Sequence, residues 1–328
     1  MVAWHEDPAL NLILPETVDR VASLAGPADY LFLVYGNRGE LDLARVPADV
    51  QAEIRSSYPL ALLPVGFITP GDLDVRGLVL TMTDAPNLFS VDQLSLVLRN
   101  VRLFMEAVGA RAVGLAGRTP AEIASKRIPR HSSYIMGLYE STSTVIRSAL
   151  AALRARNIEP EEVTFGVAGI GYFGRIVFRY LGRDLRYRVV GYDPAIPETS
   201  FDRDMIFTND PSYLFHCREV ITLPPDGEMI RYLLEHCQPG TIFLDDSHPR
   251  PSREVMREVR EVGEIVFAGV AREGIGFFPP LPGRLAQEIP GCCLGAILRA
   301  KGRTIRSTTQ ASLAAEEFGF MPLLATFP

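Results

Sequence analysis

A glycine-rich turn between two apolar runs is the stretch whose residue types and spacing most clearly suggest chemistry. The run from Val163 to Ala168 leads into the turn Gly169, Ile170, Gly171, Tyr172, Phe173 and Gly174. Three glycines so spaced allow a tight turn, a close approach of the backbone to a pyrophosphate, and close packing of helix on strand. The N–H groups and the dipole at the start of the following helix would attract phosphate.

An acid ends the second apolar run. Residues 187–192 predict a strand, and Asp193 follows it, 19 residues beyond Gly174, where a carboxylate can accept hydrogen bonds from ribose hydroxyls. The strand predicted over 219–223 ends nearby, so Leu223 and Pro224 should line the same crevice. The sequence thus predicts a dinucleotide site; the alternative is a Rossmann-like domain that has lost its cofactor. The predicted cofactor-binding residues are Gly169, Gly171, Tyr172, Phe173, Gly174, Asp193, Leu223 and Pro224. Asp193 favours NADH, because its carboxylate would repel a 2′-phosphate.

A pair of adjacent cysteines is the second candidate for chemistry. Pro290 and Gly291 precede Cys292 and Cys293, and the residues that follow have helical composition. Cys292 should lie in the first turn of this helix, where the dipole favours the nucleophilic thiolate. Cys293 would point about 100° away and pack inside, and the two exchange roles if the helix starts one residue later. A buried packing role remains the alternative for either cysteine.

A histidine completes the candidate catalytic set. His248 follows the strand predicted over 241–246, at the carboxyl end where α/β sheets bind ligands, and is the candidate proton donor. The alternative is a loop histidine that bonds only to its neighbours. Cys217 and Cys237 also follow histidines, but their spacing does not suit zinc, so we predict no metal site.

The elements around these residues predict an α/β fold. A chain of 328 residues suggests two domains. Strands are predicted over 30–36, 61–68, 77–83, 112–117, 163–168, 187–192, 219–223, 241–246 and 264–270. Helices are predicted from Ser90, over 132–157, over 228–237 and over 252–262. Strands that alternate with helices indicate a Rossmann-like doubly wound parallel sheet.

Four segments are expected along the chain. Residues 1–135 form a smaller N-terminal α/β domain for substrate or carrier, and residues 136–160 a connecting helix. Residues 161–290 form the Rossmann dinucleotide-binding domain. Residues 291–328 form a C-terminal helical segment that carries the catalytic cysteine and packs back on the N-terminal domain.

Composition excludes several classes. Apolar residues make up 47% of the chain and charged residues 22%, as in soluble enzymes, and a net charge of −6 argues against nucleic-acid binding. No leader and no membrane-spanning run is visible. Four cysteines are too few for a disulfide framework. We therefore expect a cytoplasmic protein without a membrane span.

Over nearly its full length the sequence resembles the long-chain acyl-ACP reductases, which reduce carrier-bound acyl thioesters to aldehydes with a nicotinamide cofactor. The resemblance rests on the stretches GLAGRTPAEI, GLYESTSTVIRSALAALRARNIEPEEVTFGVAGIGYFG, FLDDSHPR, GCCLGAIL and EEFGFMPLLA. Cys292 falls where the family has its acyl-accepting cysteine. The family's nucleotide loop reads closer to GATGxIG and suits NADPH, whereas this chain has GIGYFG and Asp193.

The resemblance also implies partners. The substrate would be a thioester of acyl carrier protein or of CoA, and an aldehyde-consuming enzyme could take the product. An acidic carrier would need a basic landing area on this net-acidic chain. Two candidate areas are Arg118, Lys126, Arg127 and Arg130, and Arg299, Lys301, Arg303 and Arg306.

Two other functions compete with thioester reduction. The first is an NAD-dependent alcohol or hydroxyacid dehydrogenase of the shikimate- or 2-hydroxyacid-dehydrogenase type, with His248 as base, Asp245 or Asp246 as its partner, and Arg272 for the substrate acid. The second is a nucleotide-sensing or partner-binding protein without catalysis. Replacing Cys292 by alanine should abolish thioester reduction but barely affect a dehydrogenase.

Overall fold

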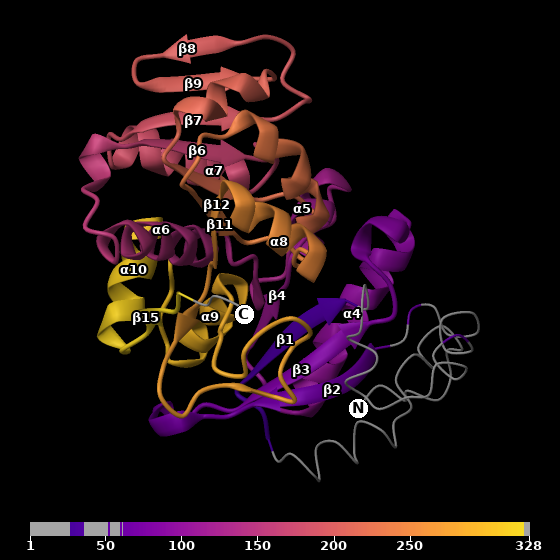
Figure 1. Cartoon of the computed structure of the whole chain (residues 1–328). Helices are drawn as coiled ribbons and strands as arrows, with labels where there is room; N and C mark the ends of the chain where they lie inside the picture. Colours follow the sequence, from indigo (N-terminus) through magenta and orange to yellow (C-terminus); the bar gives the residue numbers. More distant parts are fainter. Residues whose placement is uncertain (1–26, 36–51, 53–59, 61, 325–328) are drawn as a thin grey trace. The chain divides into compact units, whose positions relative to one another are not determined.

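The computed structural model describes residues 27–35, 52, 60 and 62–324. It divides into two compact units (Figure 1). Unit 1 comprises residues 1–137 and 272–305, and unit 2 comprises residues 138–271 and 306–328. This division differs from the expected segments. Residues 272–290, expected in the Rossmann domain, belong to unit 1, and the expected C-terminal segment is shared between the two units.

Unit 1 is built on a six-stranded sheet with the order β14-β2-β3-β1-β4-β5. Its strands are β1 (Tyr30–Tyr35), β2 (Leu62–Ile68), β3 (Gly77–Met82), β4 (Ala112–Leu115), β5 (Tyr134–Ile135) and β14 (Phe277–Phe278). β1 runs parallel to β3 and β4, whereas β2 runs antiparallel to β3. Four of these strands match the predicted runs; Gly36 and Ala61, at the ends of two predictions, lie outside the described residues.

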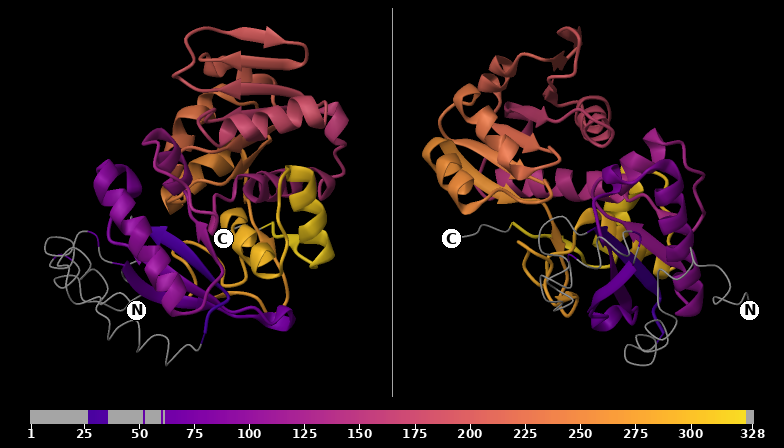
Figure 2. Two further views of the ribbon diagram at one scale, coloured as in Figure 1. Left: turned by 180° about the vertical axis from the view of Figure 1, so that it is seen from behind. Right: turned by 90° about the vertical axis from the view of Figure 1, so that its right-hand side faces the viewer.

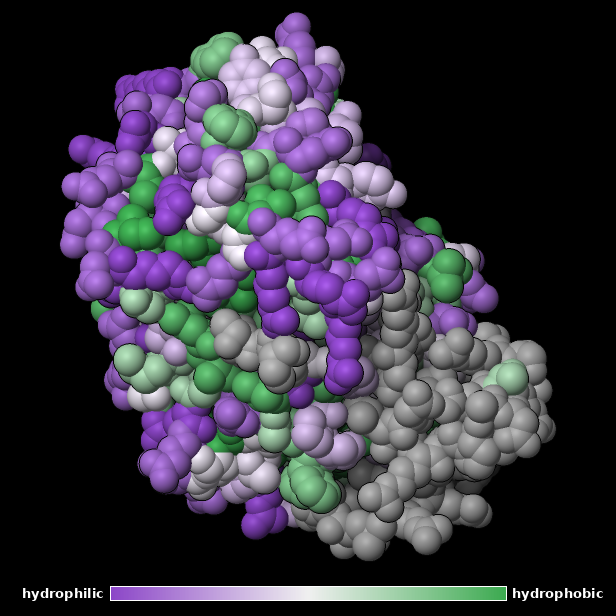
Figure 3. All heavy atoms as spheres, viewed as in Figure 1, coloured by the Kyte–Doolittle hydropathy of each residue, from purple (hydrophilic) through white to green (hydrophobic). Residues whose placement is uncertain are grey.

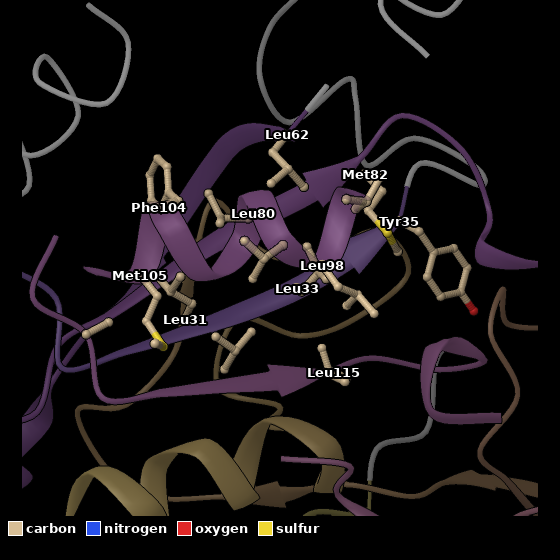
Figure 4. Packing of buried hydrophobic residues seen from close by; sticks show 14 of the residues in the cluster. Leu31, Leu33, Tyr35, Leu62, Leu80, Met82, Leu98, Phe104, Met105 and Leu115 are labelled. Atoms are coloured by element: carbon tan, nitrogen blue, oxygen red, sulfur yellow. The ribbon is translucent and has the colours of Figure 1, made fainter. Parts of the chain in front are cut away.

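Helices cover both faces of this sheet. Ser90 caps α4 (Val91–Ala107) through a capping box with Gln93, which fixes the helix start as predicted. Leu98, Phe104 and Met105 of α4 pack onto the apolar side chains of β1 and β3 (Figure 4). The opposite face contacts α9 (Gly291–Ala300) through β1 and β4. Shorter helices of unit 1 are η2 (Gly71–Leu73), η3 (Pro86–Leu88) and α5 (Thr119–Ser125).

Unit 2 is built on a seven-stranded sheet with the order β12-β11-β10-β6-β7-β9-β8. Its strands are β6 (Thr164–Ala168), β7 (Arg188–Tyr192), β8 (Ser200–Asp202), β9 (Met205–Thr208), β10 (Glu219–Thr222), β11 (Thr241–Asp245) and β12 (Gly263–Phe267). Neighbouring strands are parallel except for the β8–β9 hairpin at the edge. Because parallel strands start at one edge and end at the other, all their carboxyl ends meet at one edge of the sheet.

Helices on both faces make this sheet doubly wound, as the sequence predicts. One face is covered by α6 (Leu138–Arg154), α7 (Gly174–Arg179) and η5 (Tyr180–Asp184), and the other by η6 (Pro211–His216), η7 (Gly227–His236) and α8 (Arg253–Val262) (Figures 1 and 2). The short helix η4 (Pro160–Glu162) directly precedes β6. α10 (Thr308–Glu317) packs against α6. A two-stranded ribbon pairs β13 (Val270–Ala271) with β15 (Met321–Pro322). The α/β Rossmann-like fold is thereby confirmed.

Three predicted elements differ from the observed ones. The helix expected over 132–157 begins only at Leu138, because β5 and Gly137, whose φ of +65° lies in the left-handed region, precede it. The helix expected over 228–237 is the 3₁₀ helix η7. The strand expected over 264–270 ends at Phe267, and Val270 pairs with the C-terminal ribbon instead.

No helix in the described part of the chain combines the length and the apolarity that a bilayer crossing requires. On the face of unit 2 shown in Figure 3, apolar side chains lie among hydrophilic ones. Exposed large apolar residues of this unit include Phe201, Phe215, Met229 and Tyr232.

Candidate functional site

The glycine turn joins β6 to α7 in the way the sequence predicts. Gly169 has a φ of +98° and donates its N–H to the carbonyl of Tyr192 (2.9 Å). A Cβ on Gly174 would lie 1.9 Å from the carbonyl oxygen of Gly169, so helix and turn touch with no room for a side chain. A Cβ on Gly171, by contrast, would meet nothing within 4 Å. The turn is therefore tightly packed on two sides and open on the third, where a phosphate could approach.

The other predicted cofactor residues surround this turn. Leu223, after β10, donates its N–H to Ala168 (2.9 Å), and its carbonyl oxygen would lie 3.0 Å from a Cβ on Gly169. Pro224 continues from it and is half-buried. Tyr172 is exposed, whereas Phe173 packs against the core that α6 and α7 form on the sheet. Phe173 thus anchors the turn, and Tyr172 presents its ring to solvent.

Asp193 follows β7 at the same edge of the sheet. Its N–H donates to the carbonyl of Thr208 (3.1 Å), and its Oδ1 accepts from the N–H of Ala195 (2.9 Å). This carboxylate is half-buried and held in one orientation by its own turn. Its position at the end of the strand next to the glycine turn is the one that recognition of ribose hydroxyls requires.

A buried acid lies at the carboxyl end of β11. Asp245 is 1% exposed and accepts hydrogen bonds from the hydroxyls of Thr222 (2.8 Å) and Ser247 (2.7 Å). Burial raises its pKa, although these hydrogen bonds act in the opposite direction. Asp245 thus ties the end of β10 to the loop that carries His248. His248 itself is half-buried and precedes Pro249 through a cis peptide bond.

The segments that follow the strands of unit 2 take different paths. The ends of β10 and β11 lie at the edge of the glycine turn, but Val270 and Ala271 form the ribbon with β15. Arg272 belongs to unit 1, where its guanidinium forms a two-pronged ion pair with Asp72 (Nε to Oδ1 3.0 Å, Nη2 to Oδ2 2.7 Å). This ion pair lowers the pKa of Asp72.

Cys292 lies in the first turn of α9, as the sequence predicts. Pro290 is the N-cap, and Cys292 is the second residue of the helix and half-buried. Cys293 is fully buried, and burial, together with the neighbouring Cys292, raises the pKa of its thiol well above the usual value. The first turn therefore turns Cys293 into the core and leaves Cys292 the more accessible of the pair.

Two glycines of unit 1 pack closely against Cys292, and no local sequence signal indicates either contact. A Cβ on Gly137 would lie 2.7 Å from the Cα of Cys292 and 3.1 Å from its Cβ. A Cβ on Gly114, in β4, would lie 2.9 Å from the carbonyl oxygen of Cys292. The backbone on both sides thus fixes where α9 starts and where the Cys292 side chain leaves it. Cys292 belongs to unit 1 and His248 to unit 2.

A second buried acid lies in the first turn of α6. Glu140 is 6% exposed, and burial raises its pKa to about 7. The sequence around Glu140 predicts only an amphipathic connecting helix, and nothing in it indicates that this acid is buried. Its environment, and not its residue type, makes it unusual.

One of the two candidate basic areas is partly neutralised. Arg118 and Lys126 both pair with Glu122 (3.5 Å and 2.6 Å). Lys301 donates to the carbonyl of Leu73 (3.0 Å), and Arg299 donates to the hydroxyl of Thr304 (2.5 Å). The ion pairs with Glu122 reduce the charge that the first area could offer a carrier protein, whereas the hydrogen bonds of Lys301 and Arg299 orient these side chains without neutralising them.

Comparisons with known proteins give structural neighbours only. No family model matches the chain, and no curated protein does so at a significant level. A 5,10-methylenetetrahydrofolate dehydrogenase from the silkworm, Bombyx mori, is 12% identical over 92% of this chain and 94% of its own, with a TM-score of 0.43. A D-lactate dehydrogenase from Treponema pallidum is 12% identical over 87% and 95%, with a TM-score of 0.35. A D-lactate dehydrogenase with NAD⁺ from Lactobacillus jensenii is 10% identical over 88% and 97%, with a TM-score of 0.32.

Proposed function

We propose that this chain is an NAD(P)-dependent oxidoreductase. The observation that carries the proposal is the turn between β6 and α7, closed at Gly169 and Gly174 and open at Gly171. A helix start with unpaired N–H groups, approached over a glycine without a side chain, suits the pyrophosphate of a dinucleotide. Asp193 supports NADH over NADPH, because a second negative charge beside its carboxylate would be repelled.

Substitution of Gly171 tests cofactor binding separately from folding. A Cβ here meets nothing within 4 Å, so we expect Gly171→Ala and Gly171→Val to unfold at the temperature of the wild type. The same side chain would occupy the space that the pyrophosphate needs. We expect NADH affinity, measured by the fluorescence of the bound nicotinamide, to fall progressively from glycine to alanine to valine. Equal affinity in all three proteins would refute the dinucleotide site.

For the reaction, we propose reduction of an acyl thioester through Cys292. Support comes from the position of Cys292 at the second residue of α9, where helix N–H groups and dipole stabilise thiolate. The thiolate would attack the thioester carbonyl, form a new C–S bond and release the carrier thiol, which takes up a proton. A bound reduced nicotinamide would supply the hydride that converts the enzyme thioester to aldehyde and returns the thiolate. His248 is the candidate donor of the proton or hydrogen bond that the carbonyl oxygen needs.

Intact-protein mass after mixing with acyl-CoA and acyl-carrier thioesters, without nicotinamide, tests this step. An acyl adduct is expected on the wild type and on Cys293→Ala, and none on Cys292→Ala. Discharge of the adduct as aldehyde on addition of NADH or NADPH would complete the cycle. An adduct that persists in Cys292→Ala would move the nucleophile elsewhere.

The hydroxyacid dehydrogenase remains the second candidate, because Asp245 holds the loop of His248 at the edge of the glycine turn. Its substrate arginine is the weak point, since Asp72 occupies the guanidinium of Arg272. Absence of any acyl adduct, together with NAD-dependent oxidation of alcohols or hydroxyacids, would replace thioester reduction by this reaction. Binding of NADH without turnover of either substrate class would leave a nucleotide sensor.

A further inference from the structure

A shallow, open cleft lies at the amino-terminal edge of the unit 2 sheet, the edge opposite the glycine turn. Its volume is about 430 Å³. The lining comes from strand starts and the connections before them: Ile158, Glu162, Val163, Thr164, Arg188, His216, Arg218 and Gln238. Thr164 and Arg188 are the first residues of β6 and β7, and Arg218 directly precedes β10. Because these strands are parallel neighbours, their starts gather these side chains at one place.

Two arginines in this cleft are oriented by uncharged backbone. Arg188 donates from Nη2 to the carbonyl oxygen of Glu162 (3.0 Å). The guanidinium of Arg218 lies over Gly240, with Nη1 2.9 Å from where a Cβ on that glycine would stand. The backbone N–H of Arg218 donates to Thr164 (3.1 Å). The bond to Glu162 places the guanidinium of Arg188, the close approach to Gly240 locates that of Arg218, and most of their N–H donors stay available.

Neither guanidinium forms an ion pair with a carboxylate among the described residues of the chain. Other arginines of unit 2 do: Arg183 pairs with Asp202 (3.1 Å) and Arg231 with Glu258 (2.7 Å). Among the eight lining residues Glu162 is the one acid, against two arginines and an exposed histidine. The general composition does not explain this local excess of positive charge, because the chain as a whole has a net charge of −6.

We propose that this cleft binds a small phosphate-bearing anion, held by Arg188 and Arg218. The planar guanidinium matches the oxygens of phosphate in a two-pronged geometry and keeps its charge at all working pH values. The side-chain amide of Gln238, tied to the carbonyl of Cys217 (3.2 Å), has a second N–H to offer. The site is separate from the proposed dinucleotide site and does not depend on it.

Calorimetric titration with inorganic pyrophosphate on the full chain tests the proposal. We expect binding by the wild type and at least a roughly tenfold weaker affinity in the double variant Arg188→Gln/Arg218→Gln, since each removes charge-assisted hydrogen bonds. The matched control is Arg231→Gln, another arginine of unit 2 that is already paired with acids; its affinity should equal the wild type's. Glu162→Gln should bind more tightly, because it removes the one negative charge of the lining.

Two further comparisons distinguish binding in this cleft from binding at the glycine turn. The Gly171→Val variant should keep its affinity for pyrophosphate, and the double arginine variant should keep its affinity for NADH. Citrate in place of pyrophosphate distinguishes phosphate recognition from general attraction of anions, and should bind more weakly. Pyrophosphate affinity unchanged in the folded double variant, lost in Gly171→Val, or absent from the wild type would overturn the proposal.

Discussion

Replacing Gly137 by alanine should displace Cys292 and should destabilise the fold more than the same change at a glycine that has only a left-handed φ. Two effects are combined at this position. The φ of +65° is one that residues with a Cβ rarely adopt, and the added Cβ would lie 2.7 Å from the Cα of Cys292. A distance below 3 Å to a backbone atom cannot be relieved by rotating a side chain. The start of α9 or the backbone at Gly137 must therefore move.

Gly109 provides the matched control for this substitution. It belongs to the same unit and has a φ of +75°, but a Cβ there would meet nothing within 4 Å. Gly109→Ala should thus lower the unfolding free energy by about 1–2 kcal/mol, which is the cost of holding a residue with a Cβ in the left-handed region. Gly137→Ala adds an overpacking cost of about 1–3 kcal/mol, for a total of about 2–5 kcal/mol.

The stability assay is urea unfolding of both variants beside the wild type, and the reactivity assay is alkylation of Cys292 by iodoacetamide, followed on its peptide by mass spectrometry. Displacement of the first turn of α9 should slow alkylation in Gly137→Ala by about threefold or more, because the thiol loses its alignment with the helix N–H groups. Gly109→Ala should react like the wild type. If the two variants match in stability and in alkylation rate, the contact between Gly137 and Cys292 has no role in positioning the thiol.

Three further outcomes follow from buried and half-buried groups. Burial raises the pKa of Glu140 from 4.5 to about 7, so its contribution to the unfolding free energy is fully present below about pH 4.5 and is lost as pH rises through about 7. The loss amounts to about 3 kcal/mol. The unfolding free energy of Glu140→Gln, measured in urea across this pH range, should therefore fall less with rising pH than that of the wild type. If both proteins lose the same stability over this range, Glu140 is not the group that titrates. Asp193→Ala should narrow the preference for NADH over NADPH, measured as the ratio of the two dissociation constants, and an unchanged ratio would remove Asp193 from cofactor selection. Cys293→Ala should leave the alkylation rate of the folded protein unchanged, because the native Cys293 thiol is buried and its pKa is raised; a lower rate would mean that Cys293 is the reactive thiol.

Local sequence signals were sufficient for the geometry of the glycine turn. The spacing of Gly169, Gly171 and Gly174 after an apolar run determines a strand, a turn and a helix start within a dozen residues, and the structure has these elements as predicted. The first turn of α9 followed from equally local signals, since Pro290 and Gly291 end an irregular stretch before helical composition. Turns and helix starts depend on backbone geometry that nearby residues impose, so a sequence can predict them.

Long-range pairing was the part that the sequence could not supply. Gly137 and Cys292 meet across more than 150 residues, and nothing in the stretch around Gly137 indicates what will lie against it. The ion pair of Arg272 with Asp72 joins positions 200 residues apart. The burial of Glu140 depends on what packs over α6. Contacts of this kind arise from topology, and single-sequence patterns carry no information about which elements will be neighbours.

The return of residues 272–305 to unit 1 has an energetic reason that the sequence leaves implicit. The sheet of unit 1 is apolar on both faces: α4 covers one, but Phe32 and its neighbours on the other would be left to solvent. α9 packs on that face through β1 and β4, with Ala296 beside Gly114, and its Leu294, Ile297 and Leu298 are fully buried. At about 1.5–3 kcal/mol each, these three side chains contribute about 5–9 kcal/mol, comparable to the whole stability of a domain. The helix that presents Cys292 is thus also one that unit 1 needs to fold, and this double role ties the position of the thiol to the integrity of the core.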